Sequence, residues 1–501
     1  MTTAIDQLNN AIDLIAPELI LLATVCVMFI TGPFFVSEAG VAPAGLRKRW
    51  AALSLVAIGC AWFIWFTAAR TQPVGTGPFR VDDLTWYVRG LSLTLGAVLS
   101  VMLIDQIDDA HSAEGQACLL AILAGANLTA IANDMVVLFL ALELVSIPTY
   151  VLLYLPRRGA ANQEASIKYM LLSIFSSAIA LYGMSLLYGA AGTTNLEGIA
   201  ATFTADDQAN SSALLRVATA LIIAGVSFRF PAVPFHFYAA DVYQGITSAG
   251  AAMLSFVPKM VGIVALLRLL PLIGASGISE TVADGPSAGV LLGGLAVASM
   301  LIGNLLALRQ QSLFRLFAYS GVAHAGYMLM GLAVGPSAGL ADGVSAALFY
   351  LAVYGLTTIG VFALFAGVST SDSPVRAVSD LSGLSRAHPA VALSLAVCLF
   401  SLAGLPPTSG FIGKWNLFAA SWSEGTTLGR VLAISLALNA AISAWYYLRL
   451  IAVMFLETAP AGEPRKVSLA PAIAGAVCAI GTVLLFAAPQ AVWDAAARFT
   501  P

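Results

Sequence analysis

Residues 227–259 read SFRFPAVPFHFYAADVYQGITSAGAAMLSFVPK, and they place ionisable side chains inside apolar sequence. Pro231 and Pro234 lack a backbone N–H, so a helix that enters this stretch must break or kink there. In a membrane, only protein or water can satisfy the backbone groups that such a break frees. A discontinuous helix with ionisable residues near mid-membrane indicates an ion path in transporter-like proteins. The stretch therefore predicts a polar interior inside a membrane protein.

The composition excludes a soluble globular protein, because the 501 residues are 59% hydrophobic and 10% charged, with a mean hydropathy of +0.89. The first apolar run, 17–35, is long enough to span a bilayer, and no basic signal start precedes it, so we expect it to remain as a first helix. The net charge is −3 and no Lys/Arg run resembles a nucleic-acid footprint, which excludes nucleic acid as a partner. The five cysteines lie singly in apolar runs. We therefore expect no disulfide framework, cofactor or iron–sulfur cluster in this chain.

Apolar runs of about 17 to 25 residues recur along the chain, separated by turn or charge signals. We expect an all-α polytopic membrane protein with about fourteen transmembrane helices and no long soluble insert. The expected spans are 17–36, 51–69, 88–104, 116–132, 134–155, 165–189, 213–230 (continuing after a break to 246), 249–271, 287–307, 313–334, 343–368, 389–405 (continuing to 421), 431–456 and 468–494.

The loops between these spans carry unequal numbers of basic residues. One side collects Arg47, Lys48, Arg49, Arg157, Arg158, Arg309, Arg315, Arg376, Arg386, Arg465 and Lys466. The other side collects Arg70, Arg80, Arg89, Arg216, Arg268, Arg430 and Arg498. Because positive loops stay on the cytoplasmic side, this bias predicts that both termini are periplasmic. The compact chain without a presequence favours a bacterial cell inner membrane.

The remaining basic residues fall inside the apolar runs, namely Lys168, Arg229, Lys259, Lys414 and Arg449. An isolated charge at the bilayer centre costs about 2.5–3.5 kcal/mol. Lys259, Lys414 and Glu143 together would cost on the order of 10 kcal/mol against lipid, which is comparable to the stability of a whole domain. We therefore expect these side chains to face a polar interior.

Glu143 and Lys259 both fall near the middle of their expected spans. A carboxylate at mid-membrane can accept a proton or pair with a cation. A buried lysine can exist charged or neutral at physiological pH, which suits a proton relay. The alternatives are a purely structural ion pair for Glu143 and a side chain that snorkels to the interface for Lys259.

Arg229 and Lys414 lie where prolines and glycines loosen a helix. A guanidinium does not deprotonate in proteins, so Arg229 cannot itself carry a proton. It either pairs with Glu143 or holds the carbonyls of the broken helix. Lys414 follows two prolines and two glycines within 406–413, where water can enter, and we expect it to end the relay. The alternative for Lys414 is an anchor near a helix end.

His236, His324 and Lys168 are further relay candidates. A histidine titrates near neutrality and passes protons between its two nitrogens, and Tyr319 and Tyr327 flank His324. Either histidine is equally compatible with a hydrogen-bonded core residue. Lys168 starts its apolar run, so snorkelling to the interface is an equal alternative. The sequence shows no histidine pair with metal-ligand spacing, no phosphate-binding loop and no nucleophile elbow.

Two stretches with helix-breaking prolines resemble each other, namely RFPAVPFHFY at 229–238 and AGLPPTSGFIGKWNLF at 403–418. In both, prolines, small residues and aromatics surround a basic residue. Similar breaks in the two halves of a transporter are what an inverted repeat predicts. The expected units are a three-helix segment at 1–115, repeats at 116–271 and 287–456, and a C-terminal helix at 457–501.

Several motifs together resemble one family of membrane proteins. They are PELILLATV at 17–25, ALELVSIPTYVL at 141–152, VPFHFYAADVYQG at 233–245, VPK at 257–259, RQQSLFRLFAYSGVAHAGYM at 309–328 and GLPPTSGFIGKWNLF at 404–418. This set is similar to the antiporter-like membrane subunits of the proton-pumping NADH:quinone oxidoreductase, respiratory complex I. The resemblance covers nearly the whole chain.

The resemblance implies fourteen helices with two inverted five-helix repeats, in which helices 7 and 12 are broken. The family's helix-five glutamate falls on Glu143, its helix-eight lysine on Lys259 and its helix-twelve lysine on Lys414. The helix-seven position usually carries lysine, and Arg229 stands there in this chain. This departure implies either a fixed switch charge or a route centred on the two lysines.

The function implied is that of a proton-translocating membrane-arm subunit. NADH, FMN, iron–sulfur clusters and quinone are then expected in partner subunits, and the partners are other membrane-arm subunits, including another antiporter-like one, together with lipid. Two alternatives stay open. The chain is a subunit of a multisubunit cation/proton antiporter, or it is a scaffold that fills the membrane arm without pumping.

Overall fold

Most residues that the structure describes are helical. The computed structural model describes residues 11–37, 40–67, 74–155, 159–204, 212–274, 288–335, 342–369, 374–458 and 467–498. The helices of the first half are α2 (Ala16–Thr31), α3 (Leu46–Thr67), α4 (Asp83–Leu103), α5 (Ser112–Ile131), α6 (Met135–Tyr154), α7 (Ala160–Ala191), α8 (Leu196–Thr204), α9 (Ser212–Ser227), α10 (Ala239–Gly245) and α11 (Ser248–Gly274). Those of the second half are α12 (Ala288–Leu308), α13 (Leu313–Val334), α14 (Gly343–Val368), α15 (Leu384–Ala387), α16 (Pro389–Ala403), α17 (Ser409–Ser423), α18 (Thr427–Leu456), α19 (Leu469–Ala487) and α20 (Gln490–Ala497).

Among the described residues, 12 helices are long and apolar enough to cross a membrane. Two further expected spans fall on the shorter apolar helices α9 and α16. A turn-rich segment, 228–238, separates α9 from α10, and residues 404–408 separate α16 from α17. The chain is thus an all-helical membrane protein, with one small antiparallel hairpin of β1 (Val74–Thr76) and β2 (Phe79–Val81) that the sequence did not predict.

Capping residues and prolines explain where the observed helix ends differ from the expected ones. The span expected at 88–104 begins at Asp83, because Asp82 caps it by accepting a hydrogen bond from the Thr85 N–H. The expected helix 468–494 is wrong as a single element. It divides into α19 and α20 at Pro489, which has no N–H to continue the first helix.

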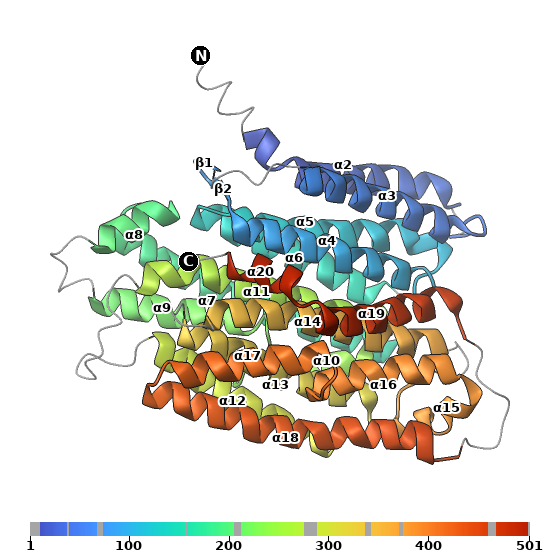
Figure 1. Cartoon of the computed structure of the whole chain (residues 1–501). Helices are drawn as coiled ribbons and strands as arrows, with labels where there is room; N and C mark the ends of the chain where they lie inside the picture. Colours follow the sequence, from blue (N-terminus) through green and yellow to red (C-terminus); the bar gives the residue numbers. More distant parts are fainter. Residues whose placement is uncertain are drawn as a thin grey trace.

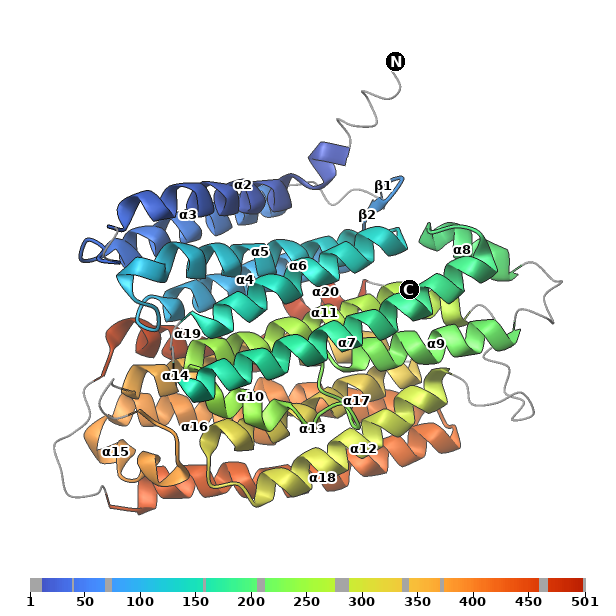
Figure 2. The same cartoon turned by 180° about the vertical axis from the view of Figure 1, so that it is seen from behind.

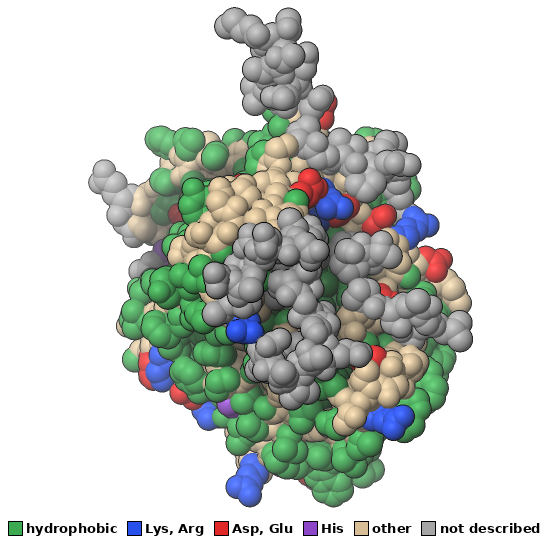
Figure 3. Space-filling view, turned by 90° about the vertical axis from the view of Figure 1, so that its left-hand side faces the viewer, with side chains coloured by type: hydrophobic (Ala, Val, Ile, Leu, Met, Phe, Trp, Pro, Cys, Tyr) green, Lys and Arg blue, Asp and Glu red, His purple; other side chains and the backbone are tan. Residues whose placement is uncertain are grey.

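The helices run side by side along one direction, as Figures 1 and 2 show, with α2 and α3 at one edge and α12 and α18 at the opposite edge. The interior is formed by α5, α11, α13 and α14; the apolar window of α11 is 100% buried, against 28% for α2. Figure 3 looks along the helices at the end that carries α8 and the hairpin, where hydrophobic side chains form much of the outline. A side chain that points inward from α11 is therefore separated from lipid by other helices.

The start of α2 and the end of α20 lie at the same end of the bundle, on the side of β1, β2 and α8 (Figure 1). Most basic residues of the two loop groups lie in the described part, but Arg70, Arg157, Arg158, Arg465 and Lys466 lie outside it. Two members of the smaller group are buried inside the helix bundle. Arg89 lies in α4 and Arg268 in α11, and they are only 6% and 8% exposed, so counting them as loop charges was wrong.

Candidate functional site

Lys259 lies in the middle of α11 and is 0% exposed. Its Nζ donates to the Ser255 carbonyl and to the Tyr354 hydroxyl of α14, both at 3.0 Å. Gly321 of α13 closes the third side, because a Cβ there would lie 3.0 Å from the amine. The amine is thus enclosed by three helices and held by neutral acceptors. It points into the bundle, and its stem does not reach the lipid boundary.

Lys414 lies on α17, close to the end of the preceding helix, and is 5% exposed. Its Nζ donates to the carbonyls of Leu402 and Ala403, both at 2.9 Å. These are carbonyls at the C-terminus of α16, which lack partners within that helix and attract a cation. Gly404 follows with φ +82°, and a Cβ there would lie 2.6 Å from the lysine Cδ. The glycine therefore lets the backbone turn and admits the lysine.

Between the two lysines lies His324 of α13, which is 1% exposed. Its Nδ1 is 2.6 Å from the Tyr350 hydroxyl, and its Nε2 is 2.9 Å from the Tyr447 hydroxyl. The His324 ring centroid lies 4.9 Å from that of Tyr354, the partner of Lys259. Because both ring nitrogens have a hydroxyl partner, this histidine can take a proton on one side and release one on the other.

A polar chain can be followed from one lysine to the other, and we refer to Lys259, Tyr354, His324, Tyr350, Tyr327 and Lys414 as the central chain. Tyr327 packs edge-on to Tyr350 at 6.0 Å between centroids, and the Lys414 amine lies 5.1 Å from the Tyr327 ring centroid. Among the described residues, no direct hydrogen bond joins Tyr354 to His324 or Lys414 to a tyrosine hydroxyl. Tyr350 and Tyr327 also meet only through their rings. A water or a side-chain movement is therefore needed at three junctions, namely Tyr354–His324, Tyr350–Tyr327 and Tyr327–Lys414.

The central chain is buttressed by amide and hydroxyl groups from α12 and α18. Asn304 donates to the Tyr327 hydroxyl at 3.3 Å and to Asn439 Oδ1 at 3.0 Å, and it accepts from Tyr446 at 2.9 Å. Ser320 bonds the Tyr447 hydroxyl. Among these residues the sequence singled out only Tyr327, as a neighbour of His324. Tyr350 and Tyr354 lie one helical turn apart in an apolar run, and that spacing could have identified them.

Arg229 and Glu143 form an ion pair outside the central chain. Arg229 Nη2 lies 3.4 Å from Glu143 Oε1, and Nη1 donates to Ser146 Oγ at 2.9 Å and to the Leu142 carbonyl at 3.1 Å. Ser177 of α7 donates to the same Glu143 oxygen at 2.5 Å. The guanidinium therefore binds α6 and α7. No described carbonyl of 228–238 accepts a hydrogen bond from it, which argues against the role of holding the freed carbonyls.

Besides Arg229, three basic or histidine residues from the apolar runs lie outside the central chain. Lys168 is 41% exposed and pairs with Glu164 at 2.5 Å and Asp241 at 3.4 Å, in a surface cluster in which Asp241 also binds Arg315 at 2.8 Å. His236 is half-buried in the segment between α9 and α10, and its Nδ1 has no hydrogen-bond partner among the described residues. Arg449 of α18 donates to Gln311 at 2.7 Å.

Two buried ion pairs were also missed. Arg89 binds Glu18 at 2.7 Å, and Arg268 binds Asp82 at 2.6 Å, with each of the four side chains at most 8% exposed. Burial, the largest single influence, raises the pKa of the Asp82 carboxyl. The positive charge of Arg268 and the hydrogen bonds from Arg268 and Thr85 outweigh the effect of burial. The pKa of the Asp82 carboxyl is therefore lowered overall. The residues of each pair are far apart in sequence, so no local pattern joins them.

The central chain offers amines, phenols and an imidazole, which are groups for moving protons. Among the described residues, no group of three His, Cys, Asp or Glu side chains could hold a metal ion, and the five cysteines are free. No carboxylate in the described part forms an ion pair with Lys259 or Lys414. The arrangement therefore suits stepwise proton transfer between two uncompensated lysines.

Comparisons with known proteins give the family. The family model described as NADH:quinone oxidoreductase/Mrp antiporter, transmembrane, matches residues 132–439. NADH-quinone oxidoreductase subunit N of Trichlorobacter lovleyi is 37% identical, over 91% of this chain and 90% of the relative. Subunit N of Geobacillus kaustophilus is 35% identical, over 97% of both chains.

Solved structures show the same fold. A chain of respiratory complex I from Thermus thermophilus superimposes with a TM-score of 0.78 at 27% identity, over 97% of this chain and 100% of that one. A chain of the Mrp complex from a Dietzia species also gives a TM-score of 0.78, at 21% identity over 96% of both, which shows the fold alone. The chain belongs to the family of NADH-quinone oxidoreductase subunit N, the antiporter-like membrane subunits.

Proposed function

We propose that this chain works as subunit N in the membrane arm of an NADH:quinone oxidoreductase and translocates protons along the central chain. The observation that carries the proposal is the burial of Lys259 and Lys414 on separate helices, each held by neutral acceptors. Such lysines cost the protein stability, and uncompensated amines inside a membrane are retained for proton transfer. NADH, FMN, iron–sulfur clusters and quinone belong to partner subunits in this proposal.

The two lysines exchange one proton through His324. Because like charges disfavour each other, protonation of one amine makes protonation of the other less favourable. A proton on Lys259 passes by way of the Tyr354 hydroxyl to His324, and then by way of Tyr350 toward Lys414. Moving one charge against 100 mV costs about 2.3 kcal/mol, which is comparable to one charge-assisted hydrogen bond. Rearranging one or two such contacts is therefore enough to drive the step.

The Glu143–Arg229 pair supplies the switch in this mechanism. Arg229 cannot release its proton, so it acts as a fixed charge whose distance from Glu143 sets the electric field at Lys259. At 3.4 Å the contact is loose, and Ser177 holds the same carboxylate oxygen more closely. A small movement of α7 or of the segment after α9 therefore changes the pairing. Redox chemistry in the partner subunits produces that movement.

The architecture of two inverted five-helix repeats follows from the same proposal. We assign α5, α6, α7, α9 with α10, and α11 to the first repeat (116–271), and α12, α13, α14, α16 with α17, and α18 to the second (287–456). The interruptions after Ser227 and Ala403 occupy the fourth place in both groups, which supports this assignment. In this assignment, α9 with α10 is the broken helix 7, and α16 with α17 is the broken helix 12. The helices before and after the repeats, in 1–115 and 457–501, provide contacts to neighbouring membrane-arm subunits.

The orientation proposed is periplasmic for both termini, in a bacterial inner membrane. The first and last described helices have their outer ends on one side (Figure 1). Arg47, Lys48 and Arg49 begin α3 at the opposite side, and Arg386 lies in α15 there. Positive charge gathers on the cytoplasmic side of membrane proteins.

The test replaces Lys259 by Met in the assembled complex and measures quinone reductase activity and proton uptake by sealed membrane vesicles. Moving a proton past this position without an amine costs about 2.5–3.5 kcal/mol, so coupled turnover should fall roughly a hundredfold. Lys168→Met is the matched control, because that lysine is exposed and lies outside the central chain; it should keep the wild-type proton-to-electron ratio.

Three results would contradict the proposal. If Lys259→Met keeps wild-type coupled turnover, Lys259 is not part of the proton path. If Lys259→Met impairs assembly but keeps the normal number of protons per electron, the chain is a scaffold. Sodium-dependent acidification by vesicles that hold this chain without redox partners indicates a cation/proton antiporter.

A further inference from the structure

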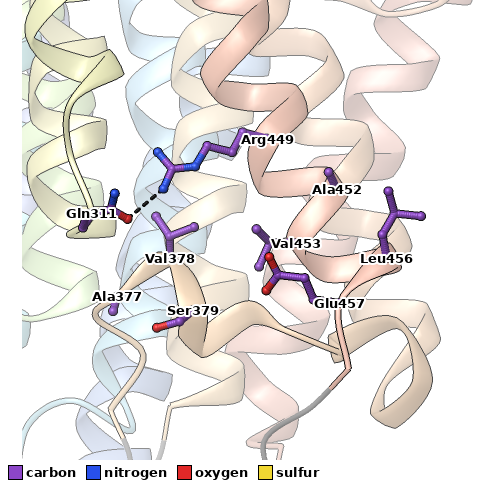
Figure 4. Close-up of a pocket in the computed structure, with 9 residues that line it drawn as sticks. All are labelled: Gln311, Ala377, Val378, Ser379, Arg449, Ala452, Val453, Leu456 and Glu457. Atoms are coloured by element: carbon purple, nitrogen blue, oxygen red, sulfur yellow. Dashed lines mark hydrogen bonds between the residues drawn. The ribbon is translucent and has the colours of Figure 1, made fainter.

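A pocket of about 440 Å³ lies where α18 meets the segment 377–379. Its lining includes Gln311, Ser379, Arg449, Leu456 and Glu457. Figure 4 shows that Arg449 and Glu457 both reach into the space between α18 and this segment. The pocket lies on the outer side of the bundle, away from the central chain, and proton transfer between the lysines makes no use of it.

The depth of the pocket matches a lipid headgroup. The 30 residues of α18 extend roughly 45 Å, whereas the hydrocarbon core of a bilayer is about 30 Å thick. Each end of a centred helix therefore projects about 7 Å beyond the hydrocarbon. Arg449 lies seven residues before the end of α18, roughly 10 Å along the axis. Its long side chain reaches from the hydrocarbon boundary into the headgroup layer.

The pocket holds one cation and one anion that do not neutralise each other. Arg449 gives one hydrogen bond, to Gln311 at 2.7 Å, which leaves most of its five N–H donors for another acceptor. Glu457 accepts from Ser382 at 2.7 Å through Oε2, and no described residue donates to Oε1. Within the described part of the chain, no ion pair of 4.0 Å or less joins Arg449 to Glu457. Asp380, next to the lining segment, is occupied in accepting the N–H groups of Arg376 and Ala377.

We propose that this pocket binds the headgroup of a zwitterionic phospholipid that ends in a primary ammonium, as in phosphatidylethanolamine. The phosphate takes the free N–H groups of Arg449, and the ammonium donates to Glu457 Oε1 and to the Ser379 hydroxyl. Charge complementarity selects this class. A purely anionic headgroup would meet the carboxylate of Glu457, and a trimethylated ammonium has no N–H to donate to it.

The acyl chains have an apolar surface beside the pocket. Along the outer face of α18, Leu448 and Trp445 are 42% and 69% exposed, and Leu301 and Leu305 of the neighbouring α12 are 44% and 47% exposed. A lipid whose headgroup enters the pocket lays its chains along this face. The site is independent of the proton path, so its failure and that of the proposed function are separable.

The experiment captures the lipid in the assembled complex within nanodiscs. Leu456, which lines the pocket and is 79% exposed, is replaced by the photoreactive residue p-benzoylphenylalanine. The nanodiscs contain equal amounts of phosphatidylethanolamine, phosphatidylcholine and phosphatidylglycerol with identical acyl chains. After irradiation, mass spectrometry of the labelled peptide gives the lipid class. The same replacement at Leu438, which is exposed on the same helix but distant from the pocket, is the matched control.

We expect phosphatidylethanolamine to exceed the other two lipids several-fold at Leu456 and to match its bulk share at Leu438. Arg449→Gln should lower the crosslinking of all three lipids at Leu456, because all three carry the phosphate, whereas Glu457→Gln should keep the crosslinking but remove the excess of phosphatidylethanolamine over the other two. Equal ratios at both positions, a preference for the anionic lipid, or crosslinks to a protein subunit would each overturn the assignment. The quinone reductase activity of the complex that carries the photoreactive residue is measured before irradiation and confirms that the complex is intact.

Discussion

The contact between Lys259 and Tyr354 gives the most direct test of the central chain. Tyr354→Phe removes only the hydroxyl that accepts from the lysine amine at 3.0 Å. The ring stays in its buried position, 2% exposed, and its face remains 4.9 Å from the amine. The amine keeps the Ser255 carbonyl as an acceptor. The change therefore isolates one of the two hydrogen bonds of a fully buried lysine.

The size of the effect follows from the loss of one of the two hydrogen bonds of the Lys259 amine. A hydrogen bond to a charged group contributes about 1.5–3 kcal/mol, and 1.4 kcal/mol corresponds to a factor of ten in a protonation equilibrium. The hydroxyl stabilises the charged amine more than the neutral one, so its loss lowers the ratio of protonated to neutral Lys259 by roughly 10- to 150-fold. More acid is then needed to load this position. Proton translocation should fall at neutral pH and recover partly as the pH is lowered.

The assay is the pH profile of proton uptake and of quinone reduction by membrane vesicles that contain the whole complex. Tyr87→Phe is the matched control, because Tyr87 is also buried and donates one hydrogen bond, to the Leu348 carbonyl at 2.7 Å, outside the central chain. Both variants lose one tyrosine hydroxyl. Only Tyr354→Phe should move the pH profile toward acid.

A wild-type pH profile in Tyr354→Phe would refute the role of this hydroxyl, provided that the amount of assembled complex is unchanged. Equal shifts in Tyr354→Phe and Tyr87→Phe would show a general loss of stability. Either outcome would leave no specific role for the Tyr354 hydroxyl in protonating Lys259.

Two further predictions concern a buried ion pair and a glycine. Asp82→Asn keeps the helix cap but strands the cation of Arg268, so it should cost about 3–5 kcal/mol of stability in thermal unfolding, and adding Arg268→Gln should restore part of the loss. Because the Asp82 pKa is lowered, the ion pair contributes its full stability above about pH 4 and loses it only as the pH falls through the lowered pKa. The stability deficit of Asp82→Asn should therefore be constant across the neutral range. A larger loss of stability in the double variant would contradict the claim that the deficit comes from the unpaired Arg268 cation. Gly404→Ala should cost about 1–2 kcal/mol for its positive φ and should also displace Lys414 and slow translocation. Gly425→Ala, with φ +76° and open space around its Cβ, should show the backbone cost alone, and equal translocation in the two variants would exclude contact with the lysine as the cause.

The sequence determined which segments enter the membrane and which charges enter with them. Apolar runs of spanning length predict helices because the bilayer leaves backbone groups no other partner. Lys259 and Lys414 were identifiable for a related reason, since an amine inside such a run is too costly to face lipid. Both are 5% exposed or less in the folded chain. These are local properties, readable within one helix length.

Only the tertiary structure decided which side chains meet. Tyr354 reaches Lys259 across 95 residues of sequence, and Arg268 reaches Asp82 across 186. Lys168 was expected inside an apolar run, at its start, yet it lies at the surface in a charged cluster. Hydropathy and helix period specify how far a residue lies along its helix and on which face, but the neighbour that this face meets depends on how helices from both halves of the chain pack together.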